Sequence, residues 1–416
     1  MTLISVEEAT LRITSGLQRL PAEQAALLDA LGRVLATSIH AGTAIPAHPT
    51  SSMDGFAVRA ADVPQAPGVL KLAADIPAGV IPDIELSPSE TARIMTGAIV
   101  PRGADSVVPV EETSAQWAAG EGVALGAEIT ILRAPRPGDF IRAAGSDLMP
   151  GQAVLAAGTV LRPPDIGVLA ALGHATVDVV RRPVVAILST GDELAEPGQP
   201  LAPGQIYDAN AYALTTLVRS WGAVPVRVPS ARDTLDSVRE AFRAALAHSP
   251  DLILSSAGVS VGAYDVVRSV IEEFGAVEFW RVNLRPGKPL AFGRIGGVPL
   301  IGLPGNPVSA LVTAELFARP ALAALGGWPA SVETVQVTAG EALRSDGRRS
   351  YLRVILRREN GVWTAITTGT QSSSALLSLV LADGLLIIPE GVTEVAPGTT
   401  CTVRLLRPLP AAAEQE

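Results

Sequence analysis

Residues 182–326 alternate short, strongly apolar runs with stretches of helical character. Residues 184–188 and 252–254 have the composition of buried strands, and each ends in a turn rich in serine and glycine. Strands that alternate with helices form right-handed βαβ units and a mostly parallel sheet. We therefore expect a central, mostly parallel α/β domain. Its expected strands are residues 184–188, 224–228, 252–254 and 298–302, and its expected helices follow Asn210, Asp233, Asp265 and Pro307.

Three turns in this region follow expected strands. STGDEL is residues 189–194, SSAGVSVG is residues 255–262, and GLPGNPVSA is residues 302–310. Open α/β sheets bind ligands outside the carboxyl ends of their strands, where such turns meet. The sequence therefore predicts a ligand site at this edge of the sheet.

Outside residues 182–326 the sequence patterns change. Ser5 followed by Glu8 is a capping-box pattern for an N-terminal helix, and residues 22–36 are expected to form a second helix. Residues 45–180 contain short β-like runs broken by Gly and Pro, and helical signals stop after Trp328. We expect an N-terminal helical linker region with an inserted β-rich module over residues 1–180, the α/β domain over residues 181–327, and a C-terminal β-barrel domain over residues 328–408.

Composition excludes several classes of protein. The chain has 416 residues and a formal net charge of −9, which argues against a general nucleic-acid binder. Its single cysteine, Cys401, fits a reducing compartment, and we find neither a secretory signal nor about 18 uninterrupted apolar residues. We therefore expect a cytoplasmic protein that does not span a membrane. None of the four histidines has zinc-ligand spacing, so the expected metal is a hard cation, with Mg²⁺ first.

Lysine is nearly absent, yet one lysine lies in a glycine turn. Of the 32 Lys and Arg residues only Lys71 and Lys288 are lysines, and Lys288 stands in the sequence RPGKP, close to Arg285. Since the chain uses arginine at almost every other basic position, a lysine in this turn indicates that a compact ammonium group is needed there. We expect this turn to bind an anion. The alternative is a β-turn that carries a lysine by chance.

The turns STGDEL and SSAGVSVG carry groups that can bind anions or cations. Ser189, Thr190 and Gly191 are suited to line a phosphate or pterin group, and Asp192 and Glu193 supply adjacent carboxylates. The same residue types also cap helices, so this reading is not unique. In the second turn, backbone donors suit an oxyanion, and its candidate ligand-binding residues are Ser255, Ser256 and Gly258. The alternative is a simple connection between a strand and a helix.

Four further positions are ambiguous when each is read alone. Asp265 suits either Mg²⁺ or the N-terminus of a helix. Asp54 precedes Gly55, a dipeptide typical of hairpin turns, and Thr96 lies at a strand terminus. Asp147, in the sequence Gly-Ser-Asp, gives the weakest signal. Only a wider pattern can assign these residues to a site.

That wider pattern is a resemblance. TSSMDGFAV, RIMTGA, STGDEL, IYDAN, SSAGVSVG, RPGKPLAFG and GLPGNPVSA occur in this order and at these separations. The set resembles the MoeA family of molybdopterin molybdenumtransferases, which is related to the E domain of gephyrin. The similarity extends over nearly the whole chain. Seven motifs in order are far more specific than any one of them.

The resemblance implies the last step of molybdenum-cofactor synthesis. Adenylylated molybdopterin would bind, molybdate would be inserted at the dithiolene with Mg²⁺, and AMP would be released. It also implies an elongated homodimer, whose site lies between the α/β domain of one subunit and the β-rich second domain of the other. Partners could include the molybdopterin adenylyltransferase and maturation factors of molybdoenzymes. By motif position, the family's functional residues fall on Asp54, Thr96, Asp147, Glu193, Asp233, Asp265, Lys288, Pro304 and Pro307, and its anion-binding residues near the C-terminal module fall on Arg353 and Ser373.

The chain departs from the family pattern at a few positions. Ala257 stands where the family commonly has glycine, which narrows the approach to a phosphate. Arg281 and Arg285 stand where related chains often carry lysine, and Ser146 replaces a common glutamate. Arginine keeps the positive charge but is bulkier and planar. These departures affect the fine geometry around the anion.

The implied chemistry agrees with the composition. Molybdate is a dianion and the adenylylated pterin carries a pyrophosphate, so their repulsion must be offset by Lys288, Arg285, Arg353, backbone N–H groups and Mg²⁺. The dithiolene sulfurs are the ligands of molybdenum, so no Cys or His nucleophile is required. The carboxylates, Glu193 and Asp265 first, either bind Mg²⁺ or orient water and the leaving group.

Two alternatives remain at this stage. The adenylyltransferase that makes adenylylated molybdopterin shares the α/β domain and its turns, but it usually lacks the additional modules expected here. A non-catalytic scaffold of the gephyrin type is the second alternative. The carboxylates and Lys288 argue against the scaffold.

Overall fold

The computed structural model describes residues 3–115, 124–256, 269–270, 273–359 and 361–409. The chain divides into two compact units. The larger unit comprises Met1–Ala36, Gly158–Ile166 and Thr176–Glu416, and the smaller unit comprises Thr37–Ala157 and Gly167–Ala175.

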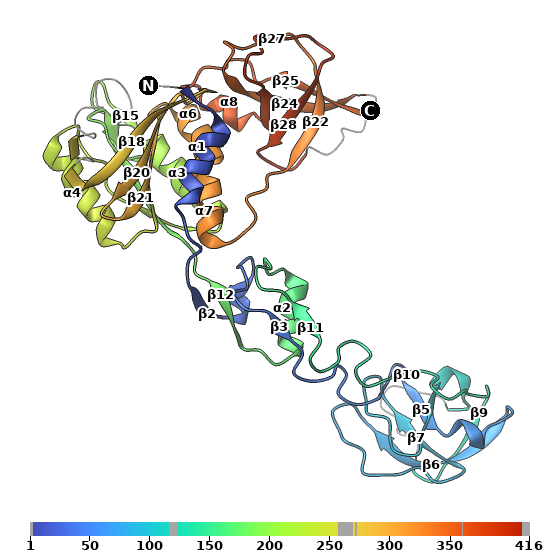
Figure 1. The fold of residues 1–416 in the computed structure, drawn as a ribbon. Helices are drawn as coiled ribbons and strands as arrows, with labels where there is room; N and C mark the ends of the chain where they lie inside the picture. The colour runs from blue at the N-terminus through green and yellow to red at the C-terminus, as the bar shows by residue number, and fades with distance from the viewer. Residues whose placement is uncertain (1–2, 116–123, 257–268, 271–272, 360, 410–416) are drawn as a thin grey trace. The chain divides into compact units, whose positions relative to one another are not determined.

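A seven-stranded sheet forms the centre of the larger unit (Figure 1). Four of its six neighbouring pairs are parallel, which confirms a mostly parallel α/β domain. Two strands that the sequence pattern did not reveal, β18 and β20, pair antiparallel and extend the sheet. In spatial order the strands are β1 (Leu3–Ile4), β18 (Gly275–Val282), β20 (Pro289–Ile295), β21 (Val298–Leu303), β17 (Leu252–Ser256), β13 (Val184–Ser189) and β16 (Val224–Arg227).

Helices cover both faces of this sheet, as the alternating burial of β13 requires. Val185 and Ile187 pack with α1, α3, α6 and α7, whereas Ala186 and Leu188 pack with α4 on the opposite face. Successive strand residues point to opposite faces, so a strand buried on both sides reads as a continuous apolar run. The helices are α1 (Val6–Ser15), α3 (Ala209–Ser220), α4 (Leu235–Ala247), α6 (Pro307–Thr313) and α7 (Arg319–Gly326).

The expected helix starts were nearly correct. The Ser5 side chain accepts a hydrogen bond from the Glu8 backbone N–H, which confirms the N-terminal cap. Asp208 caps α3 and Thr234 caps α4, so the expected caps Asn210 and Asp233 were wrong by two residues and by one. Neither Asn210 nor Asp233 is a cap, and both line the cavity described below. The helix expected after Asp265 lies outside the described residues.

One helical run is long and apolar enough to pass for a membrane span. Pro307–Gly326 comprises α6, a π-helical turn (Ala314–Ala318) and α7, and 78% of its most apolar window is buried inside the protein. It begins with proline at its first position and ends at Gly327, a left-handed C-terminal cap. It is a core helix of the α/β domain.

The C-terminal region is a closed β-barrel, as the sequence predicted. Strands β24, β25, β22, β28 and β26 pair in a ring that closes through β24 and β26. A two-residue strand from the α/β region, β19 (Leu284–Arg285), pairs parallel with β24 and so joins the barrel sheet. The ring strands are β22 (Thr334–Ala339), β24 (Arg349–Glu359), β25 (Val362–Thr367), β26 (Gly384–Ile388) and β28 (Thr400–Leu405), and α8 (Leu377–Val380) is a short helix beside them.

The second expected helix, residues 22–36, was wrong. Its first part is strand β2 (Ala22–Ala26), which pairs antiparallel with β12 (Thr176–Val180), and a 3₁₀ turn follows over Leu27–Ala30. Alanine-rich sequence favours helix locally, but pairing with a strand about 150 residues away overrides this weak preference. Helix α2 (Pro163–Ala171) was not expected.

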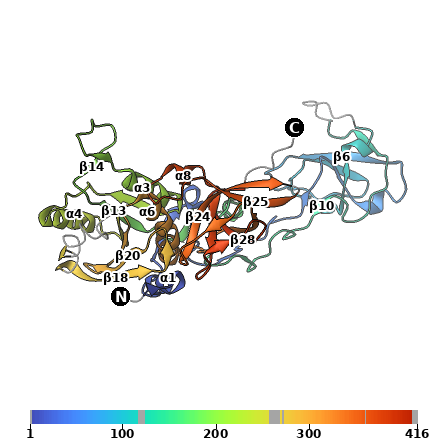
Figure 2. The same cartoon turned by 90° about the horizontal axis from the view of Figure 1, so that it is seen from above.

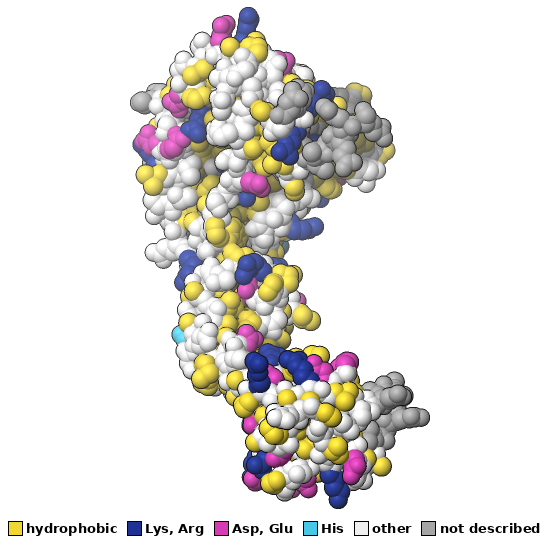
Figure 3. Space-filling view, turned by 90° about the vertical axis from the view of Figure 1, so that its right-hand side faces the viewer, with side chains coloured by type: hydrophobic (Ala, Val, Ile, Leu, Met, Phe, Trp, Pro, Cys, Tyr) yellow, Lys and Arg dark blue, Asp and Glu magenta, His cyan; other side chains and the backbone are white. Residues whose placement is uncertain are grey.

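The smaller unit is β-rich, as expected. Its five-stranded sheet has the order β8-β5-β7-β6-β9, formed by Ser106–Pro109, Gly55–Val58, Glu90–Ile94, Gly68–Ile76 and Glu128–Ile131. On the face that Figure 3 presents, acidic and basic side chains are interspersed. The remaining strands of the chain are β3 (Ile39–His40), β4 (Thr50–Ser51), β10 (Ile141–Arg142), β11 (Ala153–Leu155), β14 (Leu194–Ala195), β15 (Ile206–Tyr207), β23 (Leu343–Arg344) and β27 (Glu394–Val395).

Candidate active site

A cavity of about 1050 Å³ lies within the larger unit, at the carboxyl ends of β13, β17 and β21. This is the edge at which the three unusual turns were expected to meet. Ten of the residues predicted for the site line the cavity. They are Thr190, Gly191, Glu193, Asp233, Ser256, Arg285, Lys288, Pro304, Pro307 and Ser373.

Hydroxyl groups form the floor of the cavity where the strands end. Ser189 and Ser256 are each 1% exposed, and their hydroxyls are 3.0 Å apart in a hydrogen bond across neighbouring strands. The Ser189 hydroxyl therefore links β13 to β17, and Ser189 does not line the cavity. Thr190, the next residue, does line it.

Several buried polar atoms around this floor have no hydrogen-bond partner among the residues that the structure describes. They are Oγ1 of Thr190, Oδ1 of Asn210, Oδ1 of Asp233 and Oγ of Ser255. Thr190 is 1% exposed, and Thr190, Asn210 and Asp233 all line the cavity. Buried polar groups in native proteins are almost always satisfied, so this group of atoms indicates a place where a polar ligand binds.

The acidic side of the cavity favours a cation. Burial and the nearby carboxylates of Asp192 and Glu193 raise the pKa of Asp233 above its ordinary value. Within the described residues there is no cluster of three or more His, Cys, Asp or Glu side chains that could hold a metal ion. Mg²⁺, however, usually takes one or two carboxylates together with phosphates and water. Asp233, whose Oδ1 has no hydrogen-bond partner among the described residues, and Glu193 therefore fit Mg²⁺ beside a phosphorylated ligand.

The cationic side of the cavity is the turn of residues 285–288. Gly287 has φ +107°, and a Cβ atom there would lie 2.3 Å from Cγ2 of Thr313. The Val282 backbone N–H donates to the Lys288 carbonyl over 2.9 Å, which closes the turn. Within the described part of the chain, neither Arg285 nor Lys288 has an ion-pair partner. Both side chains line the cavity, and the charge of Arg285 also contributes to the lowered pKa of Asp346 nearby.

The barrel contributes a serine loop to the cavity wall. Ser372, Ser373 and Ser374 line the cavity, and Ser373 accepts a hydrogen bond from Asn306 at 3.0 Å. The Val308 backbone N–H donates to the Ser373 carbonyl, also over 3.0 Å. The loop is thus fastened to the N-terminus of α6.

Arg353 lies behind this loop and does not line the cavity. It is 1% exposed and donates to the Ser378 hydroxyl and the Ser372 carbonyl, each over 3.1 Å. Burial, with the nearby charge of Arg285, lowers the pKa of Arg353 to about 10. Its guanidinium adds positive potential and holds the loop. The resemblance had assigned it to anion binding.

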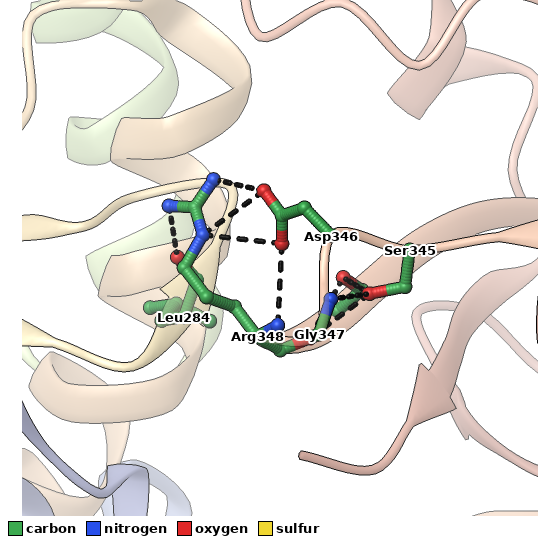
Figure 4. A network of polar contacts seen from close by, with 6 residues as sticks. Leu284, Ser345, Asp346, Gly347 and Arg348 are labelled. Carbon is green, nitrogen blue, oxygen red and sulfur yellow. Dashed lines mark hydrogen bonds and ion pairs between the residues drawn. The ribbon is translucent and has the colours of Figure 1, made fainter. Parts of the chain in front are cut away.

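Arg348 also lines the cavity, but its charge is paired with a carboxylate. The Arg348 guanidinium lies between the Asp346 carboxylate and the Leu284 carbonyl (Figure 4). Sequence reasoning missed Arg348 and Asn306, because their role depends on contacts between the barrel and the α/β domain.

An apolar wall was also missed. Leu194, Ile206 and Tyr207 line the cavity, and the Tyr207 hydroxyl donates to the Gln199 carbonyl over 2.9 Å. They belong to the paired β14 and β15, and Figure 2 shows the β14 segment projecting beyond the sheet. The motif IYDAN contains two of these residues, but in sequence it gave no sign of an apolar wall.

Three predicted residues belong to the smaller unit. Oδ1 of Asp54 accepts hydrogen bonds from the backbone N–H and the hydroxyl of Thr96, over 2.6 and 2.8 Å. The backbone hydrogen bond is the larger cause of a lowered pKa of Asp54. Asp147 is exposed, and its N–H donates to the Ile45 carbonyl. Gly258, Asp265 and the departure Ala257 lie outside the described residues.

Three family models match the chain. The MoeA N-terminal region (domain I and II) matches residues 4–173, a probable molybdopterin binding domain matches residues 186–324, and the MoeA C-terminal region (domain IV) matches residues 336–406.

Relatives extend over almost the full length. The chain is 41% identical over 400 residues to molybdopterin molybdenumtransferase 2 of Mycobacterium tuberculosis, covering 91% of this chain and 93% of that protein. It is 34% identical over 413 residues to the molybdopterin molybdenumtransferase of Bacillus subtilis, covering 98% and 95%.

A solved structure shares the architecture. The crystal structure of the molybdopterin biosynthesis protein MoeA from Pyrococcus horikoshii aligns with a TM-score of 0.81 and 32% identity, covering 98% of this chain and all of that one. Matches of this extent, in sequence and in fold, show that the chain belongs to the MoeA family of molybdopterin molybdenumtransferases.

Proposed function

We propose that the cavity is the place where this enzyme joins molybdate to molybdopterin. As a member of the molybdenumtransferase family, the chain is a transferase of molybdenum-cofactor biosynthesis. The observation that carries the assignment to this cavity is its polarity. Within the described residues, Arg285 and Lys288 line one side without an ion-pair partner. Thr190 and Asp233 line the other side, and each has a buried oxygen without a hydrogen-bond partner there.

This arrangement suits adenylylated molybdopterin as the form of the substrate. Its pyrophosphate and the molybdate dianion repel each other, and fixed cations lower the free energy of bringing them together. Lys288 supplies a compact charge and Arg285 a planar one. Hydroxyls of the serine loop and of Thr190 add neutral donors for phosphate or molybdate oxygens.

We infer that Mg²⁺ is held by Glu193 and Asp233 together with substrate oxygens. When bound, it would neutralise charge on the pyrophosphate and stabilise the AMP leaving group. Asp265, predicted as a ligand from the sequence, remains a prediction. Asp192 accepts the Asp233 backbone N–H over 3.2 Å and so holds that segment against the STGDEL turn.

The proposal extends to assembly. We infer a homodimer in which each active site takes Asp54 and Thr96 from one subunit and the cavity from the other. Residence in the cytoplasm, and exchange of substrate and product with the adenylyltransferase and with molybdoenzyme maturation factors, also remain predictions.

The test is incubation of the protein with adenylylated molybdopterin, molybdate and Mg²⁺, with AMP and active cofactor as readouts. We expect AMP release that depends on molybdate. Turnover of molybdopterin with ATP instead would indicate the adenylyltransferase, and binding of molybdopterin without turnover would indicate a scaffold. Either result would overturn the proposal.

A further inference from the structure

We propose that Arg348, held by Asp346, is a positioning residue that sets the anion-binding turn of residues 285–288 from the barrel side. This inference rests on the proposed function of the cavity and names a residue that controls it. Arg348 lies at the start of the barrel strand β24, whereas the turn belongs to the α/β domain. At the start of the turn, the two regions meet through this side chain and through the two-residue strand pair of β19 with β24.

The contacts of Arg348 are directed at the start of the turn. Its Nη1 donates to the carbonyl of Leu284 over 3.1 Å, and Leu284 directly precedes Arg285 (Figure 4). Leu284 is fully buried, so its carbonyl needs a partner. Next to this contact, β19 pairs with β24 in the register Leu284 with Arg349 and Arg285 with Ser350. Arg348 thus fixes the residue from which the turn departs.

Asp346 fixes the orientation of the Arg348 guanidinium and pairs with its charge. Its carboxylate accepts from Nη2 of Arg348 over 2.5 Å and from Nε over 3.1 and 3.2 Å. This contact is the main cause of a lowered pKa of Asp346. A bidentate carboxylate holds the planar guanidinium in one orientation and cancels its charge. Arg348 therefore differs from Arg285 and Lys288: it orients the turn, whereas they retain charge for an anion.

The backbone around Arg348 is also fixed. The hydroxyls of Ser345 and Ser350 both donate to the Arg348 carbonyl over 3.1 Å, and they lie 2.8 Å from each other. Ser345 also accepts the Gly347 N–H over 3.3 Å. Since main chain and side chain are both held, the position of the guanidinium is set before any ligand arrives. Preorganisation of this kind lowers the cost of binding.

The test compares Arg348→Ala, Arg348→Lys and Asp346→Asn with the full-length enzyme, and each is combined with Lys288→Ala. We expect Arg348→Ala to raise the molybdate KM about tenfold and to lower the melting temperature, because the buried Leu284 carbonyl loses its partner. Asp346→Asn should have a smaller effect in the same direction, and Arg348→Lys should recover little, because lysine cannot bridge carboxylate and carbonyl. Arg344→Ala, at an exposed barrel position, is the matched control and should match wild type.

The double variants separate positioning from direct binding. If Arg348 acts through the turn, Arg348→Ala should cost clearly less in the Lys288→Ala background than in wild type, because the part of its effect that passes through Lys288 is already lost. Fully additive losses would mean that Arg348 binds the anion by itself, and the proposal would be wrong. An unchanged KM in Arg348→Ala would equally overturn it.

A second readout does not need turnover. The chain has only two lysines, so the ratio of Lys288 to Lys71 acylation reports the state of the turn, with exposed Lys71 as internal reference. Arg348→Ala should raise this ratio at least twofold, whereas Arg344→Ala should leave it unchanged. If wild type releases no AMP but the ratio still responds to Arg348→Ala, the proposed function fails and the positioning role stands. An unchanged ratio would refute the positioning role.

Discussion

At the scale of single residues, charge at the cavity is divided between groups that are compensated and groups that are not. Arg348 has a carboxylate partner, and Arg353 is buried behind the serine loop. Arg285 and Lys288 are the cavity-lining cations left without a carboxylate in the part of the chain that the structure describes. The anion is therefore expected to bind at the turn that carries both.

Lys288 tests this directly. A charge-assisted contact is worth about 1.5–3 kcal/mol, so Lys288→Ala should weaken molybdate use by roughly ten- to a hundredfold at unchanged stability. Lys288→Arg should recover less than its charge alone would give, because the half-buried turn favours a compact group. Molybdate titrations of both variants provide the measurement. A wild-type titration for Lys288→Ala would remove this lysine from the site.

Asp233 predicts an unusual dependence of stability on pH. Its pKa is raised in the folded protein, so its ionised form is disfavoured there, and the penalty develops as pH rises from 3.8, the ordinary value, through the folded pKa. Asp233→Asn should therefore raise the melting temperature at pH 7, with a gain that fades below about pH 4. It should also weaken stabilisation by Mg²⁺. Thermal melts across pH, with and without Mg²⁺, measure both effects.

Asp54 is the matched control because its pKa is lowered. A lowered pKa stabilises the folded state above the ordinary value, and this stabilisation is lost as pH falls through the folded pKa. Asp54→Asn should thus lower the melting temperature at pH 7. If both variants shifted the melting temperature at pH 7 in the same direction, the opposite pKa shifts of Asp233 and Asp54 would be contradicted.

The sequence predicted these residues unevenly. Thr190, Glu193 and Lys288 could be found because each lies in a glycine-containing turn that also carries hydroxyl or charged side chains, which the turn itself does not require. Asn306 and Arg348 could not, since their partners Ser373 and Leu284 are more than 60 residues away along the chain. Local patterns do not encode such contacts.

At the scale of elements, the turn of residues 285–288 depends on one glycine against one helix. Gly287→Ala should displace the turn, since its Cβ would meet Cγ2 of Thr313 and its φ is positive. We expect a raised molybdate KM and a lower melting temperature. Thr313→Ser removes the clashing methyl group but keeps the hydroxyl that donates to the Ser309 carbonyl. Combining Thr313→Ser with Gly287→Ala should restore part of the lost molybdate affinity and stability, as measured by KM and thermal melts. No recovery would mean that the positive φ alone is responsible.

Elements were predicted where their pattern was strong. The buried parallel strands had clear apolar runs, so their positions were correct to within a few residues. The expected helix over residues 22–36 failed because its alanine-rich sequence forms β2 against β12. Strands β18 and β20 were missed since a glycine- and proline-rich turn joins them and no intervening helix marks them.

At the scale of the whole molecule, the predicted site residues lie on two separate units. If a dimer combines them, an Asp54→Ala chain mixed with a Glu193→Ala chain should regain activity, because each heterodimer has one site with neither change. Random exchange should give about a quarter of wild-type AMP release. Verified subunit exchange without recovery would count against a shared site, and each variant alone is the control.

Strand β19 has a consequence for how the chain is made. The ribosome releases residues in order, and the sheet up to β21 is complete in the nascent chain by Leu303. The Arg348 group that anchors Leu284 emerges 64 residues after it. Domains generally fold as units during synthesis, from the N-terminus onward. A nascent chain can thus fold its α/β sheet early, while its substrate-binding turn waits for the barrel, so the enzyme becomes competent only near the end of its own translation.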